Sequence, residues 1–330
     1  MASAASGPAP VYREHDLFRA AALPVLAGIY DLEGGTEIHG HDFCEIAVVG
    51  GGTGRHVCAQ GEEEVRRGAV FVLRPGAWHG FVACDHLVVA NTCVSMSALR
   101  TDLGFLRDDP GVRDLLWTGP LATGSHGVLR RRISATDADD TIAEIDLLRQ
   151  RLAAPPTSPP AHRIVLLGQL LGVLGRIAGG VAGMDAGADG DPSARAAGTV
   201  HPAVAAACAH LDTEPEHPWQ VADLARLVSL DPTYLTRLFR RHVGLSPIAY
   251  LSRLRAENAA GMLARTTLPV ARVGALVGWP DPTYFARRFR SLVGLTPTAY
   301  RRHLSLSTDT HEAPRVVGGF PGAKRSHSSE

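Results

Sequence analysis

Short apolar runs separated by glycines dominate the chain from about residue 20 to residue 95. They include EIAVVGGGTG from Glu45, GAVFVLRPG from Gly68 and FVACDHLVVANTCV from Phe81. Short β-rich runs with glycine between them are typical of all-β architectures. This region is therefore predicted to form a small antiparallel barrel or sandwich.

Farther along the chain the apolar positions change to a helical spacing. Helices are predicted at residues 136–154 and 160–178, joined by a proline-rich turn. Residues 179–199 are mainly Gly, Ala and Asp without an apolar period, which predicts a flexible linker. A compact helical segment follows at residues 200–305. The fold class is therefore predicted as α+β, with a barrel and helical pair at residues 20–178 before an all-α domain.

The two ends of the chain differ from these regions in composition. Residues 1–19 begin with small residues and proline, and residues 306–330 are polar. Chain termini of this kind are commonly disordered. We therefore expect disorder at both ends and expect the folded regions to lie between them.

One segment of the helical region occurs twice. DPTYLTRLFRRHVGLSPIAY begins at Asp231, DPTYFARRFRSLVGLTPTAY begins at Asp281, and thirteen of the twenty positions are identical. Each copy has an Asp N-cap, a proline at the first helical position and a glycine at the helix end. A shorter amphipathic helix precedes each copy, from Val221 and from Val270. The sequence thus predicts two helix-turn-helix units, joined by a long helix at about 247–264.

The repeated helices carry threonine and arginine at positions that the core does not need. These positions are Thr233, Thr236, Arg237, Arg240 and Arg241 in the first copy, and Thr283, Ala286, Arg287, Arg288 and Arg290 in the second. The second helix of such a unit enters the major groove of DNA. Arginine can read guanine, threonine can contact thymine, and later arginines can hold phosphates. The alternative is a helical repeat with a solvated basic face, but a solenoid needs about three repeats or more.

Charge is distributed unevenly along a chain whose formal net charge is +0. Residues 200–305 contain thirteen Arg, no Lys and seven Asp or Glu, a net charge of +6. Residues 31–100 contain five Arg and nine Asp or Glu, a net charge of −4. A basic C-terminal domain suits a polyanionic partner, which agrees with double-stranded DNA.

The repeated segment resembles the DNA-binding domain of the AraC/XylS family of bacterial transcription regulators, over about 105 residues. The family pattern is matched at Gly278, Trp279, Asp281, Phe285, Arg287, Phe289, Arg290, Gly294, Pro297, Tyr300 and Arg301. The resemblance implies base contacts from Thr233, Thr236 and Arg237, and from Thr283, Tyr284 and Arg287. Two positions depart from the pattern. Ser229 replaces a turn glycine, and Gly274 replaces a helix alanine at an expected cost of roughly 1 kcal/mol.

The barrel region contains a stretch rich in ligand-type side chains, HGHDFCEIAVVGGG from His39. If residues 39–49 form one strand, His39, His41, Phe43 and Glu45 share one face. With His79 downstream, the spacing resembles the two cupin motifs, whose metal-binding members hold a divalent ion with three His and one Glu. The second motif is incomplete, because an alanine stands where cupins usually have asparagine, four residues after His79.

Four interpretations of this cluster stay open from the sequence. In the first, the cluster holds a metal ion that takes part in a reaction; in the second, the metal ion is structural or helps to hold an effector. In the third, the cluster is a metal-free pocket for a small polar ligand; in the fourth, its residues bind nothing. The working prediction is the metal-free pocket, formed by His39, His41, Glu45, Trp78 and His79, with no cofactor expected. The metal alternatives would suit Mn, Fe, Ni or Zn. The family resemblance is closest to the rhamnose-responsive branch, which implies a sugar or related effector.

Together these features predict an effector-controlled transcription regulator and not an enzyme. The competing classes are a metal-dependent cupin enzyme with a DNA tether and an architectural DNA binder without ligand response. The expected partners are DNA, a small effector and a second copy paired through residues 136–178; the resemblance adds RNA polymerase. Five cysteines without a CxxC pair, and an N-terminus without signal-peptide features, indicate the cytoplasm. No membrane association is expected, because apolar runs stay well below eighteen residues.

Overall fold

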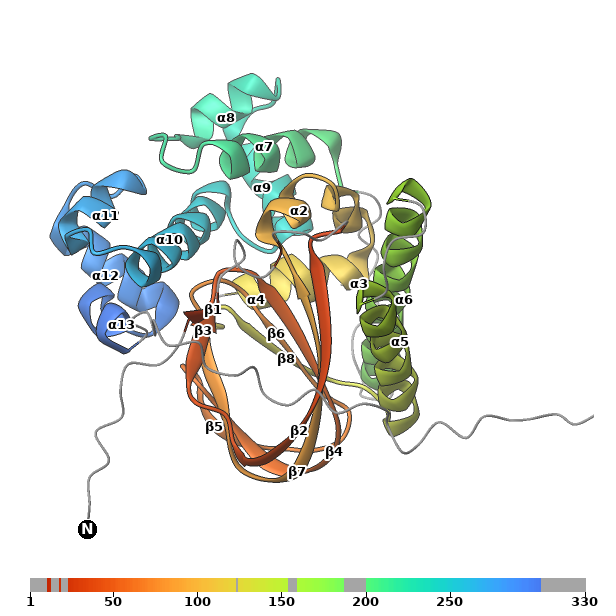
Figure 1. Ribbon diagram of the computed structural model, residues 1–330. Helices are drawn as coiled ribbons and strands as arrows, with labels where there is room; N and C mark the ends of the chain where they lie inside the picture. Colours follow the sequence, from red (N-terminus) through yellow and green to blue (C-terminus); the bar gives the residue numbers. More distant parts are fainter. Residues whose placement is uncertain are drawn as a thin grey trace, which may run out of the picture.

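The computed structural model describes residues 11–12, 18, 23–122, 124–153, 159–186 and 200–303. Figure 1 shows a β-barrel flanked by two helices, with a helical domain at one end of the barrel. The predicted α+β class is confirmed. The disorder predicted for both chain ends falls almost entirely outside the described residues. It is wrong for Val11–Tyr12, which form strand β1 and pair in parallel with Gly40 and His41.

Among the described residues, eight strands build the barrel in the order β1-β3-β7-β4-β6-β8, with β2 paired to β7 and β5 paired to β4. The strands are β1 (Val11–Tyr12), β2 (Val25–Gly35), β3 (His39–His41), β4 (Cys44–Cys58), β5 (Gly61–Val65), β6 (Ala69–Leu73), β7 (Trp78–Val94) and β8 (Val128–Arg132). All pairs other than β1 with β3 are antiparallel. The apolar runs of the sequence thus form β4, β6 and β7, as predicted.

The central strands are buried on both faces. On β4, Ile46 and Val48 pack with the flanking helices in one core cluster. Ala47 and Val49 alternate with them and belong to a second cluster inside the barrel. Because successive side chains of a strand point to opposite faces, Glu45 lies on the same inner face as Ala47 and Val49. The strand therefore directs its one carboxylate into the barrel.

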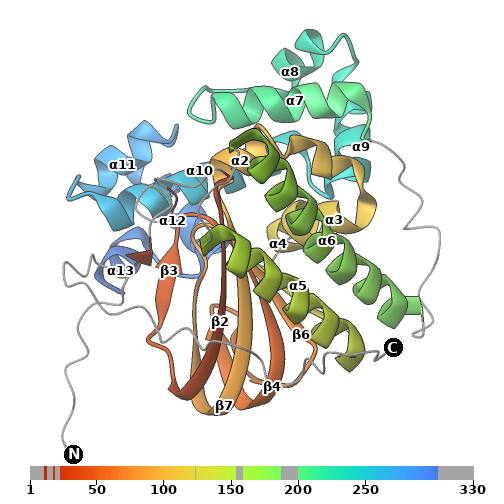
Figure 2. The ribbon, with the colours of Figure 1, turned by 45° about the vertical axis from the view of Figure 1, so that its right-hand side comes forward.

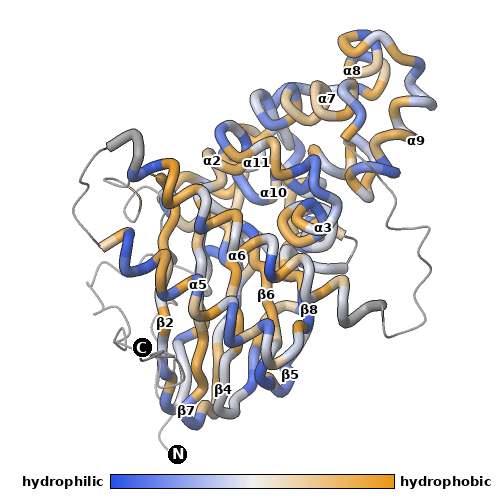
Figure 3. The backbone as a smooth tube through the Cα atoms, turned by 90° about the vertical axis from the view of Figure 1, so that its right-hand side faces the viewer, coloured by the Kyte–Doolittle hydropathy of each residue, from blue (hydrophilic) through white to orange (hydrophobic). Residues whose placement is uncertain are grey.

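Helical segments connect the barrel to the second domain. They are α2 (Met96–Arg100), η1 (Gly104–Asp108), α3 (Pro110–Arg113), η2 (Asp114–Thr118), α4 (Gly119–Leu121), α5 (Ala135–Ala153) and α6 (Pro159–Ala186). Figures 2 and 3 show α5 and α6 side by side across the outer face of the barrel. Helix α5 contacts β2, β4 and α6. The helical pair predicted from the sequence thus covers the barrel.

The predicted linker at 179–199 begins too early, because α6 continues to Ala186. Residues 187–199 lie outside the described residues. A Cβ on Gly180 would lie 2.9 Å from Ile133 Cγ2, and Val181 is buried in the core. Close packing on the barrel thus holds a glycine-rich segment in the helix despite its low helix propensity.

Helix α6 is unusually apolar. Its segment His162–Gly183 has a mean hydropathy of 1.8 and meets the length and composition of a membrane span. Core helices pass the same test, so this is weak evidence for a membrane. Leu170, Val173 and Ile177 are fully buried against the barrel, whereas Ile164 is 70% exposed. The helix therefore has one core face and one exposed apolar face.

The second domain consists of α7 (Pro202–Thr213), α8 (Val221–Leu227), α9 (Pro232–Val243), α10 (Pro247–Arg265), α11 (Val270–Leu276), α12 (Pro282–Val293) and α13 (Pro297–His303). The predicted helix-turn-helix units are α8–α9 and α11–α12, and α10 joins them. Each unit has a hydrophobic cluster of its own. Figure 1 shows α10 between the two units and near the barrel rim.

The predicted helix ends of both repeats are confirmed. The Asp231 carboxylate accepts hydrogen bonds from the backbone N–H groups of Thr233 and Tyr234, and Asp281 caps α12 in the same way. Gly244 and Gly294 end α9 and α12 with φ of 77° and 89°. Glycine adopts this left-handed conformation without a Cβ penalty. The identical residues of the repeat therefore build the two helices.

Buried ion pairs join the helical domain to the barrel domain. Arg74, which is 1% exposed and follows β6, donates to both carboxylate oxygens of Glu257 on α10, at 2.6 and 2.9 Å. Arg107 donates to Asp212 on α7 at 2.9 Å. Buried charges need such partners, because desolvation of each ion is costly. The docking of the two domains thus depends on specific charged contacts.

Candidate functional site

The first recognition helix, α9, presents a polar face on the surface. Thr233, Arg237, Arg240 and Arg241 are exposed, and Thr236 is half-buried with its hydroxyl donating to the Pro232 carbonyl. The Arg237 guanidinium lies 5.1 Å from the centre of the Tyr234 ring. A groove beside this face is lined by residues of α8 and α9. The predicted polar positions thus form one continuous surface.

The second recognition helix, α12, has a similar face. Thr283, Tyr284, Arg287 and Arg290 are exposed, and Arg287 lies 5.6 Å from the centre of the Tyr284 ring. Arg288, predicted on the exposed face, is half-buried. The groove beside α12 differs from the first, because Ala59 and His126 of the barrel domain line it with Arg287 and Arg290. The second surface therefore adjoins the barrel.

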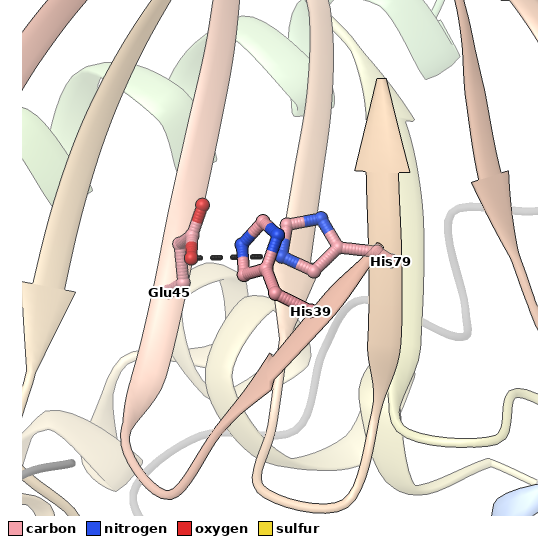
Figure 4. Close-up of side chains that lie close together, drawn as sticks. All are labelled: His39, Glu45 and His79. Atoms are coloured by element: carbon pink, nitrogen blue, oxygen red, sulfur yellow. Dashed lines mark ion pairs between the residues drawn. The ribbon is translucent and has the colours of Figure 1, made fainter. Parts of the chain in front are cut away.

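Inside the barrel, the predicted histidines and the glutamate come together. His39 is paired with His79 across β3 and β7, and their ring centres lie 4.4 Å apart. The Glu45 Oε2 atom lies 3.4 Å from His41 Nε2 and 3.7 Å from His79 Nε2. Figure 4 shows His39, Glu45 and His79 converging from three strands. These side chains form one polar cluster, in which His41, Glu45 and His79 are buried and His39 is half-buried.

Burial sets the protonation of the cluster. It lowers the pKa of His41 and of His56 to about 3, and it lowers the pKa of His39 and His79. The imidazoles are therefore neutral at pH 7, and each has one ring nitrogen that carries a lone pair. Burial raises the pKa of Glu45 to about 7, although Asn91 donates a hydrogen bond of 2.8 Å to its Oε1 atom.

Two family models match the chain. Residues 30–116 match the model described as an AraC-like ligand binding domain, and residues 224–303 match the model described as a helix-turn-helix domain. These spans coincide with the barrel and with the two repeated units. The chain belongs to the AraC family of transcription regulators. Its barrel domain is of the AraC-like ligand-binding type, and its C-terminal domain is of the helix-turn-helix type.

Curated AraC-family relatives include transcriptional activators. The activator RhaR of Salmonella schwarzengrund is 24% identical over 241 residues, which is 73% of this chain and 78% of that protein. This similarity agrees with the predicted resemblance to the rhamnose-responsive branch. The RCS-specific activator RclR of Escherichia coli is 35% identical over 80 residues, 24% of this chain and 28% of that protein. The alignments to the first three relatives span only about a quarter of those proteins.

Solved structures are also similar to this chain. ToxT from Vibrio cholerae matches with 12% identity and a TM-score of 0.45, covering 85% of this chain and 98% of that one. The C-terminal domain of AraT from Geobacillus stearothermophilus matches with 30% identity and a TM-score of 0.33, covering 34% of this chain and 95% of that one. The curated relatives are named as transcription regulators or activators, which supports the prediction of a non-enzyme.

Two details of the sequence prediction for this AraC-family chain are wrong. Residues 39–49 do not form one strand, because a bend at Asp42 and Phe43 separates β3 from β4. Trp78 is not beside the cluster. It precedes His79 on β7, so its side chain points to the opposite face, where it packs against the core of the second helix-turn-helix unit. Trp78 therefore belongs to the domain interface.

Sequence reasoning also missed residues near both sites. His56 on β4 is fully buried, and its ring centre lies 5.6 Å from that of His79. Tyr234 is not among the residues predicted for the first copy, but it is 37% exposed on the recognition face. Its place in the repeated Thr-Tyr pair, with Tyr284 as counterpart, was the available signal. His126 had no local signal, because it reaches α12 only through tertiary structure.

Proposed function

We propose that this chain is a one-component regulator whose DNA binding is controlled by a small polar molecule, such as a sugar, held in the barrel. The repeated pair of capped helices carries the proposal, because each helix presents Thr, Tyr and Arg at equivalent exposed positions. The buried polar cluster of the ligand-binding domain supplies the effector site. In this proposal the protein works in the cytoplasm, where both DNA and metabolites are present.

Each recognition helix reads bases with its first turns. The proposed base contacts are Thr233, Thr236 and Arg237 on α9, and Thr283, Tyr284 and Arg287 on α12. The proposed phosphate contacts are Arg240, Arg241, Arg288 and Arg290. Helix α10 has 19 residues and is therefore about 28 Å long. This length is compatible with two successive major-groove faces about 10 bp apart.

The effector pocket is built from His39, His41, Glu45 and His79, and the structure adds His56. A sugar hydroxyl can donate to a neutral imidazole or to a carboxylate and can accept from an imidazole N–H. Burial makes each such hydrogen bond selective, because a ligand that lacks the hydroxyl leaves a buried polar group unpaired. A polar effector thus fits the cluster better than an apolar one.

The ligand acts through the domain interface. Arg253 on α10 donates both to Ala122, in the barrel domain, and to Leu292 on α12, at 2.6 and 3.0 Å. Together with Arg74 and Glu257 it connects the barrel rim to the second unit. An effector shifts docking only by its differential affinity for docked and released forms. We expect the coupling to change DNA affinity by roughly 1–3 kcal/mol.

The exposed face of α5 and α6 is the proposed dimer surface. Leu147, Ile164 and Val165 are 40%, 70% and 40% exposed. Gly168, Gly175 and Gly179 recur at helical spacing on α6, and a Cβ at each would meet nothing within 4 Å. A second copy of this helix can approach closely there. Two copies would place two DNA-binding domains on adjacent half-sites, where the second unit can face RNA polymerase.

The test is DNA selection followed by affinity measurement. The full chain should enrich a two-part motif from a random DNA library. In fluorescence anisotropy, the double variant R237A/R287A should lose at least about tenfold in affinity for that motif. The control R132A, an exposed arginine at the end of β8, should bind like the wild type. The proposed DNA-binding surface would be refuted if no motif is enriched. It would also be refuted if R132A loses as much DNA affinity as R237A/R287A.

The effector part has its own measurement. A thermal-shift screen with sugars and other polar metabolites identifies compounds that raise Tm. A true effector should also change the affinity for the selected DNA, and E45Q should abolish both responses. A compound that stabilises the chain equally well in E45Q binds elsewhere, which would contradict the proposed pocket.

A further inference from the structure

The cluster inside the barrel has a composition that a hydroxyl ligand alone does not explain. His39, Glu45 and His79 each offer one ligand atom, and these atoms all lie within 4.8 Å of one another. Both ring nitrogens of His79 and of His56 have no hydrogen-bond partner among the described residues. Buried polar atoms without protein partners are uncommon in native proteins, and a bound ligand, an ion or a water molecule commonly satisfies them.

The hydrogen bonds around the cluster fix which atoms face its centre. The Nδ1 atoms of His39 and His41 lie 2.9 Å from the carbonyl oxygens of Glu37 and Phe43, so Nδ1–H donates and Nε2 keeps its lone pair. Asn91 donates to one oxygen of Glu45, and the other oxygen points at the histidines. Metal-binding histidines and carboxylates are oriented by bonds of this kind.

The Nε2 atoms of His39 and His41 and the second oxygen of Glu45 can accept, and one nitrogen of a neutral His79 can accept as well. A hydroxyl group has a single proton and can donate to only one of them, whereas one cation can bind three lone pairs together. A cation bound here also balances the charge that the Glu45 carboxylate, which is 4% exposed, carries when it is ionised. Bond lengths of about 2.0–2.2 Å to a metal require only small side-chain movements from the observed separations.

We infer that the barrel binds one divalent first-row transition metal ion through His39, Glu45 and His79. Two imidazoles and one carboxylate are donors that suit Zn²⁺, Ni²⁺, Fe²⁺ or Mn²⁺. Three protein ligands leave a position open, as in zinc sites that bind a water or a substrate. An oxygen atom of the effector takes this position. The inference thus deepens the proposed effector pocket and rests on it only for this last step.

The test uses the full chain without a histidine tag, stripped by a chelator and dialysed. Titration with Zn²⁺ or Ni²⁺, followed by elemental analysis, should give one ion per chain. Co²⁺ should give visible absorption bands typical of histidine and carboxylate ligands. Metal should raise Tm of the wild type. E45Q, which has almost the same shape, and H79Q should each weaken metal binding at least tenfold.

A second histidine provides a matched control. His86 is exposed and lies 3.4 Å from Asp31 and 3.7 Å from Glu33, so it is the competing surface site. H86A should bind metal like the wild type. Loss of binding in H86A, with unchanged binding in E45Q, would overturn the inference. If H79Q does not fold in the metal-free state, E45Q and H39Q decide the result, with metal-free Tm as the check of folding.

The outcome is separable from that of the proposed function. Anisotropy with the selected DNA is measured on metal-free and metal-loaded protein. Stoichiometric metal at the cluster without any specific DNA binding would refute the function and keep the metal site. The protein could instead take up no metal and still bind the selected DNA specifically, with an affinity that responds to an effector. That result would refute the metal site and leave the proposed function standing.

Discussion

The two helix-turn-helix units share a scaffold but differ in how their helices pack. Ala225 on α8 and Leu235 on α9 are both buried in the first core. The equivalent residues in the second unit are Gly274 on α11 and Phe285 on α12. A Cβ on Gly274 would lie 2.7 Å from the Phe285 ring, so the larger aromatic side chain requires the glycine. The second unit thus has a smaller residue on its first helix and a larger residue on its second helix than the first unit has.

The surroundings of the two units differ as well. The groove beside α9 is lined by residues of α8 and α9, whereas the groove beside α12 includes Ala59 and His126 of the barrel domain. Gly294, at the end of α12, is so close to Ala59 that an added Cβ would lie 3.0 Å from its methyl group. The comparison teaches that the residues shared by the two repeats give both of them the same capped helix. Tertiary contacts then decide that the barrel domain adjoins α12 and not α9.

Loss of the docking contact should have the largest effect. Glu257→Gln leaves Arg74 buried without a carboxylate, and we expect a loss of about 3–5 kcal/mol in unfolding free energy. Urea denaturation of the full chain measures it. The double variant R74M/E257M should recover much of the loss. D102N, at the exposed pair with Arg163, should cost at most about 1 kcal/mol. Equal costs for E257Q and D102N would contradict the buried docking pair.

The packing difference predicts the next largest effect. Gly274→Ala should destabilise the chain by about 1–3 kcal/mol through overpacking against Phe285. Helix propensity alone predicts the opposite sign, a gain of roughly 1 kcal/mol. G274A/F285L should be more stable than G274A in the same denaturation experiment. Stabilisation by G274A alone would show that the helices are less close than described.

The turns between the helices predict smaller effects. Ser229 has φ of 55° where Gly278 has φ of 85°. Ser229→Gly should stabilise the chain by about 0.5–1 kcal/mol, because glycine adopts this conformation without strain. Gly278→Ser should destabilise it by about 1–3 kcal/mol, since its Cβ would lie 2.5 Å from the Glu216 carbonyl oxygen. Melting curves of both variants measure the difference, and the same sign for both would contradict it.

Local signals explain what the sequence could predict. The Asp-Pro starts and glycine ends of α9 and α12 act within one helix, so the repeat alone places both recognition faces. The spacing of His39, His41 and Glu45 also indicated a polar cluster, although the bend at Asp42 and Phe43 divides the strand. The spacing was sufficient to predict this part of the cluster because His39, His41 and Glu45 are close together in the sequence.

Long-range packing explains what the sequence could not predict. Gly274 looked like a defect because its neighbour Phe285 is known only from the fold. Trp78 looked like a pocket residue, but the alternation along β7 places it against the core of the second helix-turn-helix unit. Arg74 and Glu257 are 183 residues apart, and nothing in either local sequence indicates the pair. Contacts of this kind depend on the arrangement of both domains.

The central claim is that the two repeated helices read different parts of one DNA site. Base-by-base binding profiles of R237A and R287A, measured on a library of the selected motif, test it most directly. We predict that each variant loses about 1–3 kcal/mol of discrimination, at separate base pairs about one helical turn apart. Uniform weakening on all sequences, or loss at the same base pairs in both variants, would contradict the claim.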